Sequence, residues 1–323
     1  MGEFDLIKRY FTPGHYSEDV LLGVGDDAAV MAVPQESRLV AAVDTIVEGV
    51  HFPIGTSAAN VAYRALAVNL SDMAAMGALP RWFTLSLCVP SAENEWLSEF
   101  GSALSDLATE YAVQLVGGDT VKGPLNISIQ IMGVVDQAHW LTRSGAQQGD
   151  LIFVSGVLGE AAGGLQLILN PNIEAELSFA RHLLHRFYRP IPRVELGRQL
   201  NNRLATAAMD ISDGLLTDLR KLCAASQCGA EIDLELLPAS PPLINVFGEA
   251  MAEQFALQGG DDYELLFTVP EERLPSLEQV IKMTGVPCTR IGRITRSGAV
   301  QCFRKNTPIT IADAGFDHFA ESN

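Results

Sequence analysis

The sequence is poor in cysteine and lysine, and it contains no long apolar run. Its cysteines are odd in number and scattered, without C-x-x-C spacing: Cys88, Cys223, Cys228, Cys288 and Cys302. This pattern predicts reduced residues of a cytoplasmic protein rather than disulfides or a zinc site. No apolar run reaches the ~18 residues of a membrane span, and the N-terminal residues lack the apolar core of a signal peptide. We therefore expect neither a membrane protein nor a secreted one.

Basic charge is also scarce. Lysine and arginine total 22 against 39 acidic residues, a net charge of −17, which argues against nucleic acid or an anionic membrane as the main partner. Only five residues are lysine. The G-x-x-x-x-G-K-[ST] loop and the H-R-D and D-F-G motifs of protein kinases are absent. An acidic enzyme acting on phosphates would therefore need metal cations to neutralise its site.

The apolar patterning predicts mixed α and β structure. Alternating apolar residues over 38–47 and 126–135 predict strands. Helical periodicity covers residues 57–77 and 93–113. Further strand–turn–helix patterns follow in the second half, so the class is α/β or α+β. The segments are too irregular for a barrel of eight repeated βα units.

The length predicts two domains. A chain of 323 residues is too long for one typical core. A polar, glycine-containing stretch near residues 137–150 separates the two patterned halves. We expect an N-terminal domain over residues 1–137 and a C-terminal α/β domain over residues 138–323.

Nine aspartates stand at the ends of apolar segments, beside small residues: Asp26, Asp27, Asp44, Asp72, Asp119, Asp210, Asp213, Asp261 and Asp262. Singly, each has an ordinary explanation as a tight turn, a helix N-cap or a polar stripe. As a set, they favour hard, oxygen-binding cations such as Mg²⁺. Mg²⁺ takes only one or two carboxylates per ion, so this many acids predicts several ions and a polyphosphate substrate. Bound metal would also offset the repulsion between adjacent carboxylates.

The order and spacing of seven motifs resemble the thiamine-monophosphate kinase family. The motifs are "GVGDDAAV", "VDTIVEGVHF", "ALAVNLSDMAAMGA", "VGGDT", "LTRSGAQQGD", "MDISDGLLTDL" and "GGDDYELLF". The likeness covers nearly the whole chain, from "GEFDLI" to "GFDHF". The family belongs to the superfamily of aminoimidazole ribonucleotide synthetase, selenophosphate synthetase and the hydrogenase-maturation dehydratase. The resemblance thus implies a two-domain synthetase-like fold, with an N-terminal mixed sheet and helices and a C-terminal α/β domain.

The resemblance also implies a reaction: direct transfer of the ATP γ-phosphoryl group to the phosphate of thiamine monophosphate, giving thiamine diphosphate and ADP. Several Mg²⁺ ions would assist, with ATP as co-substrate. The N-terminal domain would bind ATP and metal and join two chains in a homodimer, and the C-terminal domain would complete the active site. Phosphoryl transfer relies mainly on positioning and charge stabilisation, so it suits a chain rich in acids and poor in lysine.

Motif by motif, the resemblance implies the site residues. Metal-binding positions fall on Asp27, Asp44, Asp72, Asp119, Asp210 and Asp213. ATP-binding positions fall on Gly118, Asp119, Arg143 and Ser212, with Tyr111 a weaker candidate on the adenine side. Recognition of the thiamine substrate falls on His51, Asp261 and Phe316. The residues expected to act in the transfer itself are Arg143, Asp119 and Asp210.

Some of these residues have a structural alternative. Arg143 could form a surface salt bridge, and a lone histidine such as His51 is more often a structural hydrogen-bonding group. Phe316 could be a core residue. The chain also departs from the family pattern, because Ala42 and Val43 stand where the family often has Ser-Thr, which removes side-chain hydroxyl ligands.

A second departure is Asp261, which stands where the family commonly has the longer glutamate.

Other functions also remain open. Selenophosphate synthetase would need an N-terminal cysteine, and none precedes Cys88. The hydrogenase-maturation protein would need a C-terminal cysteine, whereas this sequence ends "FAESN". A passive divalent-cation binder could use the same aspartates, but it would not make ADP.

Overall fold

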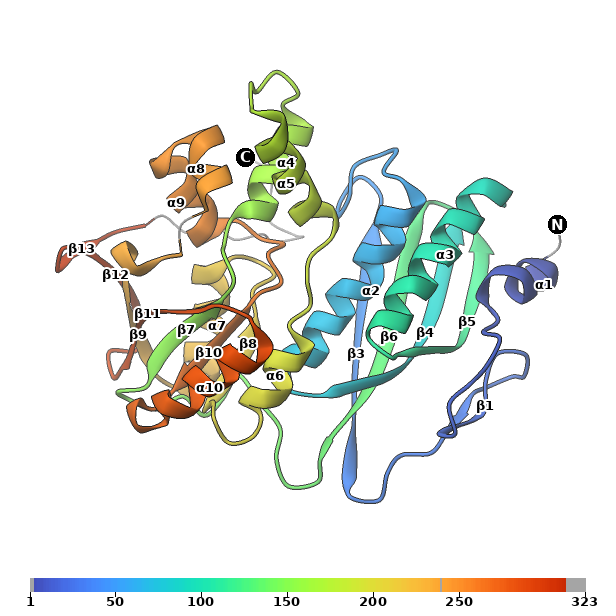
Figure 1. The fold of residues 1–323 in the computed structure, drawn as a ribbon, viewed down its shortest axis with the longest axis horizontal. Helices are drawn as coiled ribbons and strands as arrows, with labels where there is room; N and C mark the ends of the chain where they lie inside the picture. The colour runs from blue at the N-terminus through green and yellow to red at the C-terminus, as the bar shows by residue number, and fades with distance from the viewer. Residues whose placement is uncertain (1–2, 239, 312–323) are drawn as a thin grey trace. The chain divides into compact units, whose positions relative to one another are not determined.

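The computed structural model describes residues 3–238 and 240–311 and divides the chain into two compact units. The first comprises Met1–Met73 and Ala78–His139, and the second comprises Ala74–Gly77 and Trp140–Asn323. Each unit has helices and a sheet of its own (Figure 1). The expected mixed α and β fold class is confirmed.

The first unit is built on a four-stranded sheet in the order β3-β6-β4-β5. β3 (Ser37–Val47) and β6 (Asn126–Asp136) pair antiparallel along their full length. β4 (Leu79–Val89) pairs antiparallel with β6 and parallel with β5 (Gln114–Lys122). The two strands predicted from alternating apolar residues are confirmed as β3 and β6.

Helices α2 (Ala58–Ala75) and α3 (Asn94–Glu110) cover one face of this sheet (Figure 1). In α3 the buried residues recur at helical spacing, which gives one apolar stripe: Leu97, Phe100, Gly101, Leu104, Leu107 and Ala108. α3 also connects β4 to β5, the crossover that two parallel strands require. Both helices predicted from periodicity are therefore confirmed.

The opposite face of β3 is open. Side chains alternate between the two faces of a strand, and the residues on one face of β3 are exposed: Leu39, Ala41, Val43 and Thr45. Leu39 is 52% exposed and Val43 62% exposed, whereas Ile46 on the other face is only 3% exposed. The strand thus presents apolar side chains to solvent over several residues.

The N-terminal segment adds small elements to this unit: α1 (Glu3–Leu6), the π-helical turn η1 (Ile7–Phe11), and the antiparallel ribbon of β1 (Val20–Leu22) and β2 (Val30–Met31). The ribbon packs onto the sheet, where Val20 contacts a buried cluster that includes Trp82 and Val116. This packing holds the Gly-Asp-Asp turn, which lies between β1 and β2, beside the sheet.

The second unit contains a seven-stranded sheet in the order β13-β12-β9-β11-β7-β10-β8. Its strands are β7 (Leu151–Ser155), β8 (Ala207–Asp210), β9 (Gly229–Asp233), β10 (Leu265–Val269), β11 (Cys288–Thr295), β12 (Val300–Arg304) and β13 (Thr307–Ile309). β9 and β12 pair parallel, and the other neighbours pair antiparallel. Every residue of β7, β8 and β10 is buried, so this part of the sheet is covered on both faces.

The helices of the second unit are α4 (Glu160–Leu169), α5 (Leu177–Tyr188), α6 (Val194–Leu200), α7 (Leu215–Ser226), α8 (Pro241–Phe247), α9 (Glu249–Gln258) and α10 (Leu274–Thr284), with single 3₁₀ turns at η2 (Leu234–Leu236) and η3 (Glu271–Arg273). α7 packs against β8, β9 and β12, and α4 lies against α5. In the described part of the chain, no helix combines the length and apolar character needed to cross a membrane.

Candidate active site

The "VGGDT" motif lies on β5, an edge strand of the first unit's sheet. Gly118 and Asp119 of β5 stand opposite Leu85 and Ser86 of β4. A Cβ at position 118 would lie 2.0 Å from the carbonyl oxygen of Leu85, so only glycine permits this close approach. Gly118 and Asp119 line a cavity of about 40 Å³ together with Val24, which precedes the Gly-Asp-Asp turn. The fold therefore brings the first and the fourth of the seven motifs together.

A buried amide connects Asp44 to the "NLSD" motif. The N–H of Asp44 donates to Oδ1 of Asn69 (3.1 Å), and Nδ2 of Asn69 donates to the carbonyl of Ala65 (2.9 Å). Asn69 is 0% exposed, so it fixes β3 against α2 at this point. Asp72 follows three residues later on the same helix face. The preceding residue of β3, Val43, brings no side-chain oxygen to Asp44, as the departure from the family pattern suggested.

Asp26 and Asp27 form the turn between β1 and β2. Both are exposed, and the N–H of Asp27 donates to Oδ1 of Asp26 (2.9 Å). Aspartate commonly supports its own turn in this way. Water solvates both carboxylates here, so the pair does not carry the cost of burial that adjacent acids would otherwise impose.

His51 and Tyr111 both hold local backbone structure. Nδ1 of His51 accepts the N–H of Val47 (3.1 Å), which is the structural role that a lone histidine often has. In the neutral ring, the proton then sits on Nε2. Tyr111 follows the last turn of α3, and its N–H donates to the carbonyl of Leu107 (3.1 Å).

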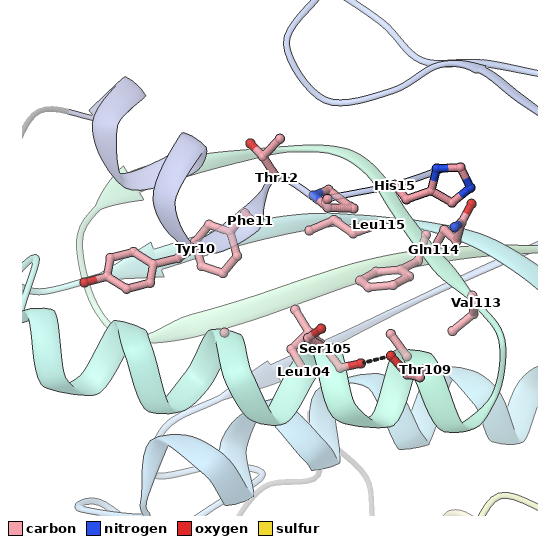
Figure 2. A pocket seen from close by; sticks show the side chains of 15 residues that line it. Tyr10, Phe11, Thr12, His15, Leu104, Ser105, Thr109, Val113, Gln114 and Leu115 are labelled. Carbon is pink, nitrogen blue, oxygen red and sulfur yellow. Dashed lines mark hydrogen bonds between the residues drawn. The ribbon is translucent and has the colours of Figure 1, made fainter. Parts of the chain in front are cut away.

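A larger cavity of about 290 Å³ lies in the same unit, and sequence reasoning missed it. It opens between residues 10–15 and the C-terminal half of α3 (Figure 2). Phe11, Leu104 and Leu115 supply apolar walls, and the polar side chains include His15, Ser105 and Gln114. Phe11 and Leu115 also line the small cavity at Asp119, so the two cavities adjoin. No residue type marks this site in the sequence, because it arises from packing of the N-terminal segment on α3.

In the second unit, two motifs that are distant in sequence run side by side. The N–H of Asp261 donates to the carbonyl of Ser212 (2.8 Å), and the N–H of Tyr263 donates to the carbonyl of Ile211 (2.8 Å). Asp210, at the end of β8, is 5% exposed and stands opposite Leu265 of β10. These contacts bring Asp210, Ser212 and Asp261 into one place.

Asp213 and Asp218 bind the same lysine, Lys221, and the sequence analysis did not single out Asp218. Nζ of Lys221 forms ion pairs with Asp213 and with Oδ1 of Asp218, the latter at 2.7 Å. Oδ2 of Asp218 accepts the N–H groups of Ser212 (3.0 Å) and Asp213 (2.9 Å). The helix N-cap explanation is wrong for the acids of this motif, because Gly214, which has no side chain, occupies the N-cap of α7. The sequence did contain a signal for Asp218, because acidic residues are favoured in the first turn of a helix.

Burial and the neighbouring charges shift the pKa values of Asp218 and Lys221 in opposite directions. Burial raises the pKa of the fully buried Asp218, although the hydrogen bond from Lys221 opposes the shift. Burial alone would lower the pKa of Lys221, but its bonds to Asp213 and Asp218 outweigh burial and raise it. The lysine therefore stays charged beside the two aspartates.

Arg143 is exposed and forms no ion pair among the residues that the structure describes. Its carbonyl accepts the hydroxyl of Ser226 (2.9 Å), which fixes the backbone but leaves the guanidinium in solvent. The salt-bridge alternative is thus not seen in this part of the chain. Phe316 lies outside the described residues.

The predicted metal residues divide between the units: Asp27, Asp44, Asp72 and Asp119 belong to the first, and Asp210 and Asp213 belong to the second. Over residues 3–238 and 240–311, no group of three Asp, Glu, His or Cys side chains could hold a metal ion. Mg²⁺ does not require such a group, because it takes one or two carboxylates and completes its shell with water and phosphate oxygens.

Comparisons with known proteins agree with this architecture. The family models for the AIR synthase related protein, N-terminal and C-terminal domains, match residues 25–135 and 147–305. Thiamine-monophosphate kinase of Escherichia coli K12 is 46% identical over 321 residues, which covers 99% of this chain and 98% of that protein. The crystal structure of thiamine-monophosphate kinase from Stenotrophomonas maltophilia K279a superimposes with a TM-score of 0.85 at 42% identity, covering 90% of this chain and 93% of that one.

A further solved structure, AaThiL complexed with AMPPCP and TMP, superimposes with a TM-score of 0.79 at 32% identity over 89% of each chain. The similarity thus extends through both units. The chain belongs to the thiamine-monophosphate kinase family, with the two domains of AIR synthase related proteins.

Proposed function

We propose that the protein transfers the γ-phosphoryl group of ATP directly to the phosphate of thiamine monophosphate, giving thiamine diphosphate and ADP. The observation that carries the proposal is the end-to-end similarity to thiamine-monophosphate kinases. A match to one domain alone would support only the fold. A structural relative of similar length has also been solved with AMPPCP, an ATP analogue, and TMP.

The donor set fits Mg²⁺. Aspartate oxygens are the ligands that this ion prefers, and Asp27 and Asp119 are exposed and able to reach it. When bound, Mg²⁺ would neutralise charge on the phosphates and draw two anionic substrates together. We assign the holding of metal to Asp27, Asp44, Asp72, Asp119, Asp210 and Asp213.

The chain's own residues position the phosphates. Gly118 has no side chain to obstruct a phosphate, and the exposed guanidinium of Arg143 can stabilise charge on the transferring group. Ser212 lies just before α7, where its hydroxyl can donate to a phosphate oxygen. We also assign roles in the transfer to Asp119 of the first unit and Asp210 of the second.

Recognition of the acceptor is assigned to His51, Asp261 and Phe316. Nδ1 of His51 accepts the N–H of Val47, and we assign its Nε2–H to donate to the acceptor phosphate. Asp261 would contact the thiamine part, and Phe316 would pack on one of its rings. A phosphate acceptor is already nucleophilic and needs no strong general base. We therefore expect no covalent phospho-enzyme.

The larger cavity beside α3 suits the adenosine part of ATP. Its volume of about 290 Å³ and its mixture of apolar walls and polar groups are typical of a small-molecule site. It adjoins the cavity at Gly118 and Asp119, where we place phosphates. Thr109 and Val113, which stand two residues before and after Tyr111 in the sequence, also line this cavity.

Two further assignments concern the whole chain. We assign a homodimer joined through the first unit, because the open face of β3 exposes Leu39 and Val43. We also assign the protein to the cytoplasm, since all five cysteines are free thiols in the described residues.

The test is mass detection of thiamine diphosphate after mixing the protein with ATP, Mg²⁺ and thiamine monophosphate. We expect stoichiometric formation of thiamine diphosphate and ADP, and none when EDTA replaces Mg²⁺. The rival function, a passive cation-binding protein, would bind Mg²⁺ without making ADP. Absence of both products from a folded sample would overturn the proposal.

A further inference from the structure

The segment that carries Asp261 has an unusual backbone. Asp261 and Tyr263 both have positive φ, at +71° and +51°, which residues with a side chain adopt rarely. Such conformations persist only where the surroundings determine them. The N–H groups of the same two residues are bonded to the carbonyls of Ser212 and Ile211.

Asp262, between these two residues, is buried against the start of a helix. It is 3% exposed, and its Oδ2 accepts the N–H of Gly159 at 2.7 Å. The backbone of Ala161, in the first turn of α4, also favours the charged form of this carboxylate. The first N–H groups of a helix lack partners within the helix and carry a partial positive charge, so a carboxylate binds well there.

Glu264, two residues after Asp262, is anchored more firmly still. It is 0% exposed, and Arg193 binds both of its oxygens, through Nε at 2.7 Å and Nη2 at 2.6 Å. Arg186 donates to Oε1 at 2.9 Å, and the hydroxyl of Ser155 donates to Oε2 at 2.6 Å. A two-pronged arginine–carboxylate pair fixes orientation as well as position.

Arg186 is in turn held by a second acid, Glu160. Nε of Arg186 contacts Oε2 of Glu160 at 3.2 Å, and Glu160 also accepts from Ser240 (2.6 Å) and contacts Nε2 of His182 (2.9 Å). In a chain with a net charge of −17, two of its few cations are thus buried in one network. The network connects α4, α5 and β10 to the segment 261–263.

We propose that Asp262 and Glu264 are positioning residues that hold segment 261–263 in its positive-φ form and thereby aim Asp261 at the acceptor. The role of Asp261 rests on the proposed function. Asp262 and Glu264 are buried, whereas Asp261 and Tyr263 are only partly buried. The two buried carboxylates are therefore placed to anchor the segment, and Asp261 is left for recognition.

The variant Asp262→Ala tests this, with Asp150→Ala as matched control. Asp150 is also a buried aspartate of the second unit, 5% exposed, and its Oδ2 accepts from Gln147 N–H and the Thr206 hydroxyl. The first readout is residue-resolved hydrogen–deuterium exchange at the amides of Asp261 and Tyr263. We expect exchange there to be at least tenfold faster in Asp262→Ala and unchanged in Asp150→Ala.

The second readout is steady-state kinetics. We expect the KM for thiamine monophosphate to rise at least tenfold in Asp262→Ala, with the KM for ATP within twofold of its original value. If Asp262 acts through Asp261, the double variant Asp261→Ala/Asp262→Ala should be no worse than Asp261→Ala alone. If Asp262→Ala does not fold, Glu264→Gln carries the same measurements, because it keeps the size of the side chain and removes its charge.

Unchanged exchange at 261 and 263, or an equal rise in both KM values, would overturn the proposal. Additive effects in the double variant would also overturn it, since the anchor would then act independently of Asp261. The exchange experiment does not depend on activity. Failure of the original protein to make thiamine diphosphate would instead refute the proposed function alone.

Discussion

Asp27 and Asp72 are two of the residues that we propose to hold metal. Asp27 is exposed in a turn, and Asp72 is partly buried on α2. Because neither side chain is fully buried, both residues are suitable for mutation.

We expect Asp27→Asn and Asp72→Asn each to reduce turnover at least ~100-fold, because each removes charge that holds a metal in the transition state. Thermal unfolding should be nearly unchanged. Asp106→Asn, on the exposed side of α3, is the control and should retain full activity. Near-normal rates for both site variants at limiting Mg²⁺ would contradict the assignment of several metal ions.

A second pair of substitutions separates the two substrates. Ser105→Trp places a large ring at the cavity beside α3, so it should raise the KM for ATP by roughly tenfold or more and leave the KM for thiamine monophosphate unchanged. Phe316→Ala should do the reverse, since loss of ring stacking costs on the order of 1 kcal/mol. Ser102→Trp, one turn earlier on α3 and not part of the cavity lining, is the control. Steady-state kinetics with each substrate varied in turn would show whether the two sub-sites are distinct.

At the scale of elements, the close packing of α4 on α5 depends on small residues. A Cβ at Gly164 would lie 2.3 Å from the carbonyl oxygen of Leu183, which belongs to the backbone of α5. A Cβ at Gly163 would meet Cδ1 of Leu243 at 2.4 Å, and this atom is the end of a flexible side chain. The two glycines are adjacent in one helix, yet their surroundings differ in how far they can move.

Alanine at either position gains up to about 1 kcal/mol of helix propensity. At Gly164→Ala, overpacking against a backbone should exceed this gain and destabilise the protein by about 1–3 kcal/mol. Gly163→Ala should stay within about 1 kcal/mol of the original, because Leu243 can rotate away. Chemical denaturation of both variants checks the contrast, and equal stabilities would show that the helices separate at little cost.

At the scale of the whole molecule, buried acids set how stability varies with pH. Burial raises the pKa of Asp262 well above its ordinary value of 3.8, although the N–H of Gly159 and the charge of Arg186 oppose the shift and Glu264 adds to it. The folded chain thus binds this proton more tightly than the unfolded chain does. The resulting stability is fully present below pH 3.8 and is lost as the pH rises through the raised pKa.

We therefore expect the free energy of unfolding to fall across that window, by as much as about 1.4 kcal/mol per pH unit for this one group. Asp262→Asn cannot titrate and should flatten the profile. Denaturation curves of the original protein and the variant at several pH values test this, and identical slopes in the two proteins would show that Asp262 does not contribute.

The open face of β3 leads to a prediction about assembly. Leu39→Glu places a charge among exposed apolar residues, and burial of an unpaired charge at an interface is unfavourable. We expect the original chain to run as a dimer in light scattering and this variant to run as a monomer at micromolar concentration. Leu177→Glu changes an equally apolar residue, 63% exposed on α5, and should leave the mass unchanged. A monomeric original chain would refute the homodimer.

Local sequence patterns were sufficient to predict several strands and helices of this protein. Alternation and helical spacing located β3, β6, α2 and α3, because the side-chain periods of strands and helices are local properties of the backbone. The order and spacing of the motifs were sufficient to identify the family. The excess of acids over bases also indicated that a phosphate-binding site in this chain would need cations.

Only the tertiary structure decided which distant residues meet. Glu264 and Arg193 are 71 positions apart, and the N–H of Asp261 reaches the carbonyl of Ser212 across nearly fifty residues. The tertiary structure also places Asp262 at a helix N-terminus rather than beside a cation, and it forms the cavity lined by Phe11 and Leu104. Such contacts depend on strand order and packing, which many sequences of the same local pattern could satisfy differently. A local pattern therefore predicts an element or a motif, whereas its partners follow from the free energy of the whole fold.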